Sequence, residues 1–312
     1  MSNCPLVSVL VPLYNHASYI EQCLDSVLND PWPSKEIIII DDGSNDESAR
    51  VVEEWYKKHS PLRTCKFHFE SRENRGLTNT LNQLVSKAKG EFIAILASDD
   101  YLLPGGITSR VMYLQQNREK DAVFGDCEVV DMKGRHIFAS GISDYHRGRR
   151  EFLADQRFIS HELVFNWCVP GPVFLARRSV YSRLGDYDEN LVVEDRDFYL
   201  RLAAHNLIGF INSPVAAYRV RLDTSRYERS VAAEIRITEG LLGAIINNMQ
   251  NYSGLCRIFL RVEALTRKSM LDRLRNKRTP DVFLRLKAGR LLRSFLRKYY
   301  MLWSRVIRAT SP

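Results

Sequence analysis

The segment KEIIIIDDGS, at residues 35–44, points most directly to the architecture of this chain. Its four consecutive β-branched residues, Ile37–Ile40, are typical of a central parallel strand that is covered on both faces. The pair Asp41-Asp42 follows at once, so both carboxylates are expected at the carboxyl end of that strand. Open α/β sheets bind ligands in the crevice beyond this end of their strands. The segment therefore predicts an α/β fold with a ligand site at one edge of the sheet.

Acidic pairs follow two further apolar runs. Asp99-Asp100 comes after the run FIAILA, and Glu194-Asp195 comes after LVV. Carboxylate oxygens are hard ligands that suit a Mg²⁺ or Mn²⁺ ion carrying a phosphorylated substrate. A separate carboxylate can then serve as a general base. The three acidic pairs together indicate metal-assisted transfer of a group from a nucleotide.

Apolar runs and helical spacing alternate over the first 220 residues. This alternation predicts a Rossmann-like, doubly wound α/β sheet, mostly parallel, with helices on both faces. The pattern weakens between residues 125 and 167, where we expect insertions and loops over the crevice. The expected strands are 7–11, 37–40, 66–69, 92–96, 122–124 and 173–176, and the expected helices include 19–28, 77–89 and 195–204.

The composition is that of an ordinary globular protein. The 312 residues suffice for one large domain with an appendage or for two smaller domains. The six cysteines form no C-x-x-C pair, which argues against a zinc site and favours a reduced, cytosolic setting. The first apolar run breaks at Pro12 and lacks a cationic region before it, so it predicts a strand rather than a signal peptide. No apolar stretch reaches the roughly 18 residues that a spanning helix needs.

Positive charge is concentrated towards the C-terminus. The net charge is +8, yet residues 251–312 carry 16 Lys/Arg and 3 Asp/Glu, and the first 250 residues have an excess of acidic groups. A helix projected over residues 281–308 separates an apolar side from a basic side, with Tyr299 and Trp303 at the border. Such a helix suits an anionic membrane surface. The alternative is a helix that packs on the catalytic domain with a solvated basic face. Nucleic-acid binding is not expected, because no recognisable nucleic-acid module accompanies the helix.

Two segments near the N-terminus are candidates for binding a nucleoside. In Pro12-Leu13-Tyr14-Asn15 the ring of Tyr14 could stack on a base while the backbone holds the ribose, although an ordinary turn explains the segment equally well. Asp41 or Asp42 could accept the N3–H of uracil or thymine. A turn or capping box accounts for Gly43-Ser44, but not for two adjacent carboxylates directly after a buried strand.

Later segments supply candidates for phosphate, metal and base. Arg75 and the backbone amides of Asn74-Arg75-Gly76 could face phosphates, or could simply begin a helix. Within Asp99-Asp100, one carboxylate could bind a divalent ion that also takes diphosphate oxygens, and the other could orient a ribose or a water. Asp195 is the candidate base for an acceptor hydroxyl, because the apolar face of its helix would hold it rigidly. The neighbouring Glu194 could merely favour the positive end of the helix dipole.

These motifs, in this order, resemble the family 2 glycosyltransferases of the GT-A fold. The resemblance covers about residues 5–220 and rests on VSVLVPLYN, IIIIDDGSND, NRGL, GEFIAILASDD and GPVFLARRSVYSRLGDYDENLVVEDRDFYLRL. It implies that the region around Pro12, Tyr14 and Asp41-Asp42 binds the nucleotide. It further implies that Asp100 binds the metal, with Asp99 near the ribose or sugar. Asp195, with Glu194 beside it, would be the catalytic base of an inverting transfer.

The segment after the last core strand departs from the family pattern. Many relatives carry Tyr-Arg-x-His, whose His can help to ligate the metal, whereas this chain has Tyr218-Arg219-Val220-Arg221. Arg221 cannot bind a cation but could pair with diphosphate oxygens. The Mn²⁺ or Mg²⁺ ion is therefore expected to have fewer protein ligands.

We therefore expect an inverting glycosyltransferase that moves a sugar from a nucleotide sugar to a hydroxyl of a lipid-linked or cell-surface glycan. The tendencies of the family favour UDP or dTDP donors and imply bacterial lipopolysaccharide, O-antigen or capsule synthesis at the inner face of the cytoplasmic membrane. The expected layout is a catalytic domain over 1–225, with nucleotide-binding part 5–124 and acceptor-binding part 125–225, and a helical basic region over 226–312 with an amphipathic helix over 281–309.

Two other functions are weaker alternatives. A sugar nucleotidyltransferase also uses an α/β sheet and carboxylate-bound Mg²⁺, but it needs a Gly-rich phosphate loop after the first strand, and VPLYNHASY has none. A non-catalytic membrane or nucleic-acid adaptor on a degenerate transferase fold would not need all three acidic pairs, which are present.

Overall fold

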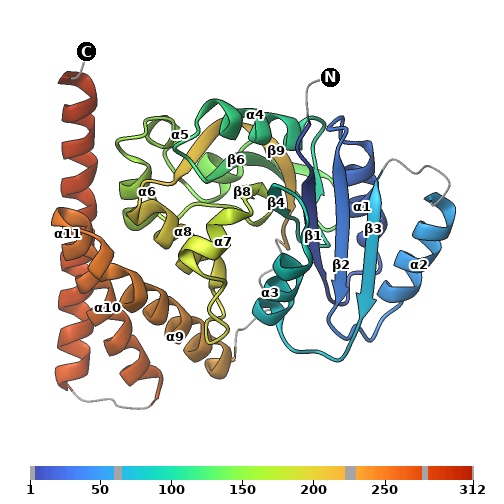
Figure 1. Cartoon of the computed structure of the whole chain (residues 1–312). Coiled ribbons are helices and arrows are strands. Elements are labelled where there is room, and N and C mark those ends of the chain that lie inside the picture. Colours follow the sequence, from blue (N-terminus) through green and yellow to red (C-terminus); the bar gives the residue numbers. More distant parts are fainter. Residues whose placement is uncertain (1–3, 60–64, 222–229, 276–279, 311–312) are drawn as a thin grey trace. The chain divides into compact units, whose positions relative to one another are not determined.

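The computed structural model describes residues 4–59, 65–221, 230–275 and 280–310, and strands alternate with helices in its first half (Figure 1). β2 is buried along its whole length, as the four isoleucines predict. The elements of this half are β1 (Val7–Leu13), α1 (Ile20–Asn29), β2 (Lys35–Asp41), α2 (Ser48–His59), β3 (Lys66–Ser71), α3 (Leu77–Lys87), β4 (Phe92–Ile95), β5 (Tyr101–Leu102), α4 (Gly106–Gln116) and β6 (Ala122–Val130).

The second half becomes increasingly helical. A π-helical turn covers Gly141–Tyr145, and 3₁₀ turns cover Gly171–Val173 and Met249–Asn251. The remaining elements are β7 (His136–Phe138), α5 (Arg150–Leu153), α6 (Ile159–Phe165), β8 (Phe174–Arg177), α7 (Ser179–Leu184), α8 (Glu194–Ala204), β9 (Ile208–Arg219), α9 (Val231–Asn248), α10 (Gly254–Leu274) and α11 (Pro280–Thr310).

The strands form one mixed sheet in the order β3-β2-β1-β4-β8-β6-β9-β5, with β7 paired to β6 beside this path. β1 to β4 are parallel to their neighbours in this series. β8 lies between β4 and β6 and is antiparallel to both, whereas β9 is parallel to β6. The predicted mixed α/β sheet is therefore confirmed, and its continuous parallel series β3-β2-β1-β4 comes from the first four strands of the chain.

The register of the parallel strands brings the ends of β1, β2 and β3 to one level. Leu13 pairs with Asp41, and Asp41 pairs with Ser71. The N–H of Asp42 donates to the carbonyl of Leu13 at 2.9 Å, and the N–H of Arg72 donates to the carbonyl of Asp41 at 3.1 Å. The three segments that follow these strands therefore leave the sheet side by side.

β6 is longer than the expected strand 122–124 and occupies part of the region expected to be loops. Gly125 and Asp126 interrupt its apolar pattern, which conceals the strand in the sequence. Asp126 is buried, but its carboxylate accepts hydrogen bonds from Oγ–H of Ser140 at 2.5 Å and from the N–H of Ile142 at 3.1 Å. Because these donors come from the π-helical turn, a polar residue can continue a buried strand here.

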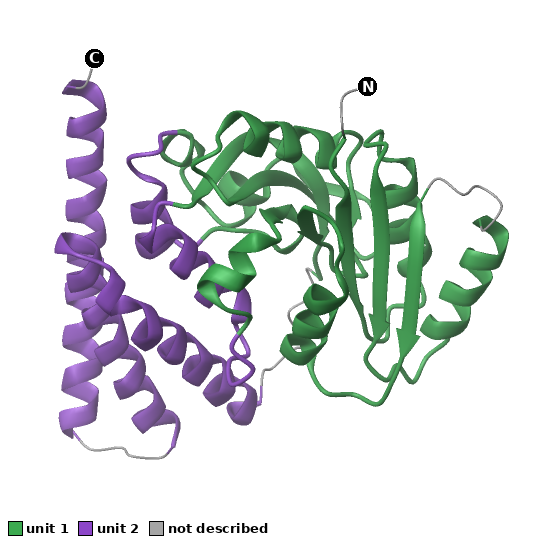
Figure 2. Ribbon diagram, in the orientation of Figure 1, with its two compact units in different colours: residues 1–154, 168–187, 207–222 green, residues 155–167, 188–206, 223–312 purple. Residues whose placement is uncertain are grey.

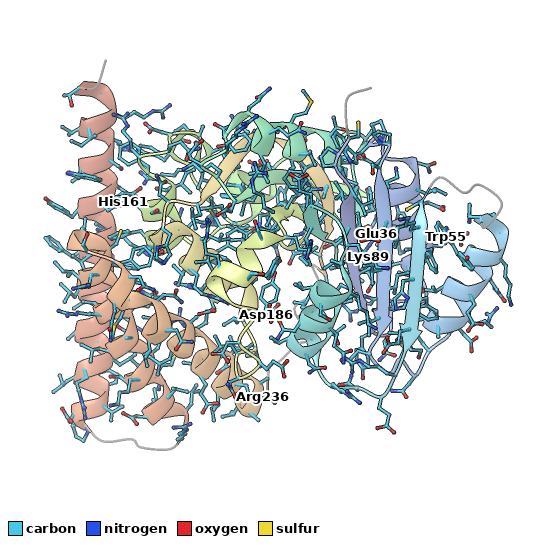
Figure 3. The ribbon with its side chains drawn as sticks, viewed as in Figure 1. Glu36, Trp55, Lys89, His161, Asp186 and Arg236 are labelled. Atoms are coloured by element: carbon cyan, nitrogen blue, oxygen red, sulfur yellow. The ribbon has the colours of Figure 1, made fainter. Side chains whose placement is uncertain are left out.

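A second buried carboxylate joins the start of β2 to the segment before β4. Oε1 of Glu36 accepts hydrogen bonds from Oγ–H of Ser8 at 2.5 Å and from the N–H of Lys89 at 2.8 Å. The same Ser8 oxygen accepts the N–H of Gly90 at 2.8 Å. Glu36 and Lys89 are labelled in Figure 3. These bonds hold the amino ends of β1 and β2 in register, at the edge of the sheet away from the acidic pairs.

The chain forms two compact units (Figure 2). Unit 1 consists of residues 1–154, 168–187 and 207–222 and contains the whole sheet with α1–α5 and α7. Unit 2 consists of residues 155–167, 188–206 and 223–312 and contains α6, α8 and the C-terminal helices α9–α11. The predicted helical C-terminal extension is thus confirmed. The domain boundary expected near residue 225 lies outside the described residues and stays a prediction.

α11 has three faces rather than the two that the sequence projection indicates. The projection placed a set of apolar residues together on one side, but the structure leaves most of that set exposed and buries a separate face. The buried face carries Val282, Leu286, Leu296, Tyr300 and Ser304. The apolar stripe of α11, which we define by its exposed members, consists of Leu284, Leu291, Leu292, Phe295, Tyr299, Leu302 and Val306, and the exposed basic residues include Lys287, Arg290, Arg297, Lys298, Arg305 and Arg308.

Tyr300 fastens the buried face of α11 to α6 within unit 2. Its hydroxyl donates to Oε1 of Glu162 at 2.8 Å, and its ring stacks on His161 with 5.6 Å between the ring centroids. Trp303 also lies against His161, at 5.4 Å. Figure 3 labels His161 on the α6 side of this contact. The aromatic contacts and the hydrogen bond together order the middle of α11.

Replacing Tyr300 with Phe should lower the free energy of unfolding by about 1–3 kcal/mol, because the buried Glu162 carboxylate loses a donor. Tyr299 is the matched control. Its side chain is half exposed, so Tyr299→Phe should change the free energy of unfolding by less than about 0.5 kcal/mol. Denaturant unfolding of both full-length variants measures the difference. Equal losses would contradict the packing of α11 described above.

Candidate active site

Asp41 is buried at the end of β2 and orders the loop that follows it. Its carboxylate accepts hydrogen bonds from Oγ–H of Ser44 at 2.5 Å and from Oγ–H of Ser71 at 2.8 Å. Oγ of Ser44 in turn accepts the N–H of Asn15 at 2.8 Å. A carboxylate has about four acceptor positions, so Asp41 can still accept a hydrogen bond from a ligand while it joins three segments.

Asp42 is buried beside Asp41, and most of its acceptor capacity is used within the protein. It accepts the backbone N–H groups of Arg75 and Gly76 at 2.8 Å each and pairs with the guanidinium of Arg72 at 2.6 Å. The expectation that these two amides face phosphates is therefore corrected. A buried carboxylate needs donors more urgently than a phosphate that water could solvate. The side chain of Arg75 itself is exposed.

Arg72 is a residue that the sequence analysis missed. Besides Asp42, its guanidinium donates to Oγ1 of Thr80 at 2.8 Å and to Oε1 of Gln83 at 3.1 Å, so it holds the start of α3. The sequence contained one signal for this role. Arg72 comes directly after a strand, and the neighbouring strand is followed by two aspartates with which an arginine could pair. The Asp42–Arg72 ion pair thus fixes the position of the loop 72–76 beside the end of β2.

At the end of β1, Tyr14 has an exposed aromatic ring and Asn15 forms a turn that hydrogen bonds hold in place. Tyr14 is 46% exposed, as a ring that stacks on a base requires, and Pro12 lies inside β1 opposite Ile40. Asn15 is held in the left-handed region, with φ of 54°, and its Oδ1 accepts the N–H of Asn45 at 2.8 Å. Asn15 therefore shapes the turn that presents Tyr14.

His16 connects this turn to the second acidic pair, and the sequence analysis did not single it out. Its Nδ1 lies 2.8 Å from Oγ of Ser98 and 3.9 Å from Oδ1 of Asp99. The only signal was its place directly after the segment 12–15. Segments that are more than 80 residues apart in the chain thus meet beside Asp99.

Asp100 is buried, whereas Asp99 is partly exposed. Oδ1 of Asp100 accepts the backbone N–H of Arg219 at 2.7 Å. Oδ2 accepts no hydrogen bond from any residue that the structure describes, and it faces the side on which Gly171 lacks a side chain. Burial, and after it the charge of Asp99, raise the pKa of Asp100 well above its ordinary value. A cation beside the two carboxylates would offset both effects.

Arg219 holds the loop that carries this acidic pair. Its backbone N–H reaches Asp100, its Nε donates to the carbonyl of Asp99 at 2.8 Å, and its Nη1 donates to the carbonyl of Asp131 at 3.0 Å. Nη2 donates to Oε1 of Gln22 at 2.7 Å. Arg219 is buried, so one guanidinium ties β9, β6, α1 and the acidic loop together inside unit 1.

The two arginines of the segment 218–221 have different surroundings. Arg221 is exposed and forms no hydrogen bond or ion pair with a described residue, so its pairing with diphosphate oxygens stays a prediction. Tyr218 lies beside the ring of His146 at 6.4 Å, and burial raises the pKa of its hydroxyl. The Tyr-Arg pair was quoted for its family pattern, and only the structure shows that Arg219 points inward.

The acidic pair fits a divalent ion that takes most of its ligands from a substrate. Oδ2 of Asp100 and the carboxylate of Asp99 have no hydrogen-bond donor among the described residues. In the described part of the chain, no three His, Cys, Asp or Glu side chains are grouped closely enough to hold a metal ion by themselves. Mg²⁺ is usually held in this way, by one or two carboxylates with phosphate oxygens and water completing its coordination.

Glu194 and Asp195 begin α8 in unit 2, and their surroundings differ. Glu194 is buried, and burial together with the charge of Asp195 raises its pKa to about 8, so it is mostly protonated at neutral pH. Asp195 is exposed, and Oδ1 accepts the N–H of Arg196 at 2.6 Å. Desolvation by the surrounding protein raises the pKa of Asp195, and Arg196 opposes that rise. Asp195 is therefore the member of the pair that a ligand can contact.

Unit 1 thus brings together the segments that follow β1, β2, β3 and β4, and these contain the sequence-predicted residues of the nucleotide and metal sites. They are Pro12, Tyr14, Asn15, Asp41, Asp42, Arg75, Gly76, Asp99 and Asp100, to which the structure adds His16, Arg72 and Arg219. The strand ends, the buried carboxylates and the open Oδ2 of Asp100 are thus grouped within unit 1. Glu194 and Asp195 lie in unit 2.

Comparison with known sequences assigns this architecture to a class of enzymes. Residues 8–185 match the family described as glycosyl transferase family 2, and the chain belongs to this family. It is therefore a glycosyltransferase of the class that uses nucleotide sugars. An uncharacterised glycosyltransferase of Rickettsia typhi is 25% identical over 271 residues, which are 86% of this chain and 74% of that protein. A chondroitin synthase of Escherichia coli is 31% identical over 137 residues, 44% of this chain but only 19% of the synthase.

Solved structures show the same fold at low sequence identity. TarS of S. aureus, in complex with UDP-GlcNAc, is 19% identical, with a TM-score of 0.62 over 91% of this chain and 79% of that one. The mannosyltransferase PcManGT of Pyrobaculum calidifontis, in complex with GDP-Man and Mn²⁺, is also 19% identical, with a TM-score of 0.58 over 98% of this chain and 86% of that one. The expected GT-A-like fold is confirmed by these similarities.

Replacing Arg219 with Lys should weaken the binding of a nucleotide sugar at least tenfold. Lysine keeps the charge but loses the planar fork that donates to the carbonyls of Asp99 and Asp131, so the acidic loop would lose its position. Arg221→Lys is the matched control, two residues away and exposed, and should change this affinity less than twofold. Thermal-shift titration with nucleotide sugars measures both variants. Equal effects of the two substitutions would refute the positioning role of Arg219.

Proposed function

We propose that this enzyme is an inverting glycosyltransferase in which Asp195 is the general base. The observation that carries the proposal is the contrast at the start of α8: Glu194 is buried, with its pKa raised to about 8, whereas Asp195 is exposed. The raised pKa of Asp195 makes its carboxylate a stronger base. Asp197 anchors the same helix turn by accepting from Nδ2 of Asn248 at 2.7 Å, which keeps Asp195 in a fixed orientation.

The donor is a nucleotide sugar, and we infer that unit 1 binds it at the ends of β1, β2 and β4. Tyr14 stacks on the base, Asp41 or Asp42 accepts its N–H, and Asp99 lies near the ribose or sugar. A carboxylate here can accept the N3–H of uracil or thymine, and the tendencies of the family favour UDP or dTDP as the donor nucleotide. Mn²⁺ or Mg²⁺, held by Asp100 and Asp99, would supply charge neutralisation for the leaving nucleoside diphosphate.

The transfer then needs one proton movement in the protein. Asp195 takes the proton of an acceptor hydroxyl as the hydroxyl oxygen attacks the anomeric carbon of the donor. The bond from that carbon to the diphosphate oxygen breaks on the opposite face, so the configuration inverts. When Asp195 is ionised, a neutral Glu194 beside it adds no second negative charge.

α11 supports a lipid-linked or cell-surface glycan as the acceptor, assembled at the inner face of the cytoplasmic membrane, as in lipopolysaccharide, O-antigen or capsule synthesis. None of the described helices is both long and apolar enough to span a bilayer. The apolar stripe of α11 is nevertheless open to solvent, and basic residues flank it. This arrangement suits a helix that lies in the headgroup region of an anionic membrane. We propose peripheral binding through α11.

The base is tested by Asp195→Asn in an assay of donor hydrolysis and of donor binding, over a panel of UDP, dTDP and GDP sugars with and without Mn²⁺. Hydrolysis should fall by about 10²–10⁴-fold, as expected for loss of a general base, while donor binding stays within about twofold. Saturating donor at a hundred times Kd should add about 2.7 kcal/mol to stability. Glu194→Gln resembles the protonated residue and should lower hydrolysis by less than tenfold.

The outcomes of this panel separate the alternatives. Near-normal hydrolysis by Asp195→Asn would remove Asp195 from its role. If none of the nucleotide sugars stabilises the protein, a non-catalytic adaptor is favoured. If the protein forms a nucleotide sugar from a nucleoside triphosphate, a nucleotidyltransferase is favoured.

Membrane binding is tested by Phe295→Gln/Leu302→Gln, which removes two members of the apolar stripe. Affinity for vesicles of phosphatidylcholine and phosphatidylglycerol should fall at least tenfold, because each large apolar side chain contributes about 1.5–3 kcal/mol when it is buried. Ile258→Gln/Leu265→Gln is the matched control, since both residues are exposed on α10. Co-sedimentation measures the affinities. If both double variants lose affinity equally, or the unmodified chain does not bind, the proposed orientation is wrong.

A further inference from the structure

Three arginines of unit 2 lie within 3.8 Å of one buried carboxylate, and a fourth arginine lies one turn further along α11. The carboxylate is that of Glu263 on α10, which is 2% exposed. The arginines, which we call the arginine cluster, are Arg196 on α8, Arg267 on α10, and Arg293 and Arg297 on α11. The three helices therefore meet at a point where positive charge exceeds negative charge.

The geometry shows that Glu263 satisfies only two of the four arginines. Its Oε2 accepts from Nη2 of Arg196 at 3.1 Å, and its Oε1 accepts from Nη2 of Arg267 at 2.7 Å and from Nε at 3.2 Å. Nη1 of Arg293 is 3.8 Å from Oε1, beyond hydrogen-bond distance. Arg297 contacts the cluster only through its charge and the face of Phe259, 5.7 Å from its guanidinium.

Unused donors remain at this place. Arg293 and Arg297 donate no hydrogen bond to a described residue, and the Nε of Arg196 is buried without a hydrogen-bond partner in the described part of the chain. Burial and the neighbouring arginines lower the pKa values of Arg196, Arg293 and Arg297, because like charges repel in a partly desolvated site. Arg196 is buried and Arg293 is half-buried, so their charges need a counterion, whereas Arg297 also contacts water. Guanidinium groups with free N–H forks suit a phosphate, which they bind in bidentate geometry.

The position of the cluster relates it to the acceptor rather than to the bilayer. Arg196 directly follows Asp195 in α8, and its guanidinium lies 5.7 Å from the ring of Trp167. On α11, Arg293 and Arg297 each come two residues after a member of the apolar stripe, Leu291 and Phe295. Two residues correspond to about 200° around a helix, so these arginines face away from the stripe that would enter the membrane.

We propose that the arginine cluster binds a phosphate group, a monoester or diester carried by the acceptor. This inference rests on the proposed function, because it identifies the acceptor through its closeness in sequence to the base Asp195. The phosphate oxygens accept from the free donors of Arg293 and Arg297 and complete the charge balance that Glu263 begins. Trp167 beside Arg196 offers an apolar ring surface for the part of the acceptor next to the phosphate.

The test compares two double variants of α11 that remove the same charge. Arg293→Gln/Arg297→Gln removes the free donors of the cluster, whereas Lys298→Gln/Arg305→Gln removes two exposed basic residues outside it. Thermal unfolding is followed during titration with inorganic phosphate and with glycerol 3-phosphate at constant ionic strength. We expect saturable stabilisation of the unmodified chain and of the control. For Arg293→Gln/Arg297→Gln, we expect at least a tenfold loss of apparent affinity.

Folding and the donor site are controlled separately. Glu263 keeps Arg196 and Arg267 in the cluster variant, so its melting temperature without phosphate should not fall. Asp100→Ala, which alters the donor site, should keep phosphate binding. Asp195→Asn should also keep it, so a failure of the proposed base leaves this site measurable, and a failure of this site leaves the base measurable.

Three results would overturn the proposal. The first is the absence of saturable stabilisation by either phosphate, and the second is an equal loss in the two double variants. The third concerns the source of the phosphate: if Arg293→Gln/Arg297→Gln lowers affinity for phosphatidylglycerol vesicles more than the control does, while soluble phosphates have no effect, the ligand is a lipid headgroup and not the acceptor.

Discussion

The burial of carboxylates at the ends of β2 and β4 is the constraint on which the site in unit 1 depends. A charged group taken out of water costs several kcal/mol unless donors replace its hydration. Asp42 therefore takes the amides of two residues and the guanidinium of Arg72, and Asp100 takes the N–H of Arg219. These requirements order the loops beyond the sheet, and the oxygens left without donors are those that a ligand can use.

Unit 2 uses the same physics with a different result. Burial and the charge of Asp195 raise the pKa of Glu194 to about 8, so Glu194 lowers the cost of its burial by taking up a proton. At the arginine cluster the balance is reversed, because three guanidinium groups lie within 3.8 Å of one carboxylate. α11 carries part of this cluster on one side and its open apolar stripe on another. A single helix thus presents surfaces for two different environments.

Much of the fold could be predicted because its signals are local. Ile37–Ile40, the acidic pairs and the alternation of strands and helices predicted the parallel half of the sheet and the strand ends that carry the site. β6 was predicted too short, because Gly125 and Asp126 break its apolar pattern and their partners come from a later turn. The roles of Arg72, His16 and Arg219 were missed for the same reason: each depends on a partner elsewhere in the chain.

The sequence by itself determined the fold class, the places where strands end in carboxylates, and the amphipathic character of the C-terminal helix, because these follow from the spacing of neighbouring residues. Only the tertiary structure decided which polar groups are free to act. In the structure the amides of Arg75 and Gly76 donate to Asp42, and Arg219 rather than Arg221 holds the acidic loop. Part of α11 stays exposed. The physical reason is that hydrogen-bond partners and burial depend on segments far apart in the chain, as in the 119 residues between Asp100 and Arg219.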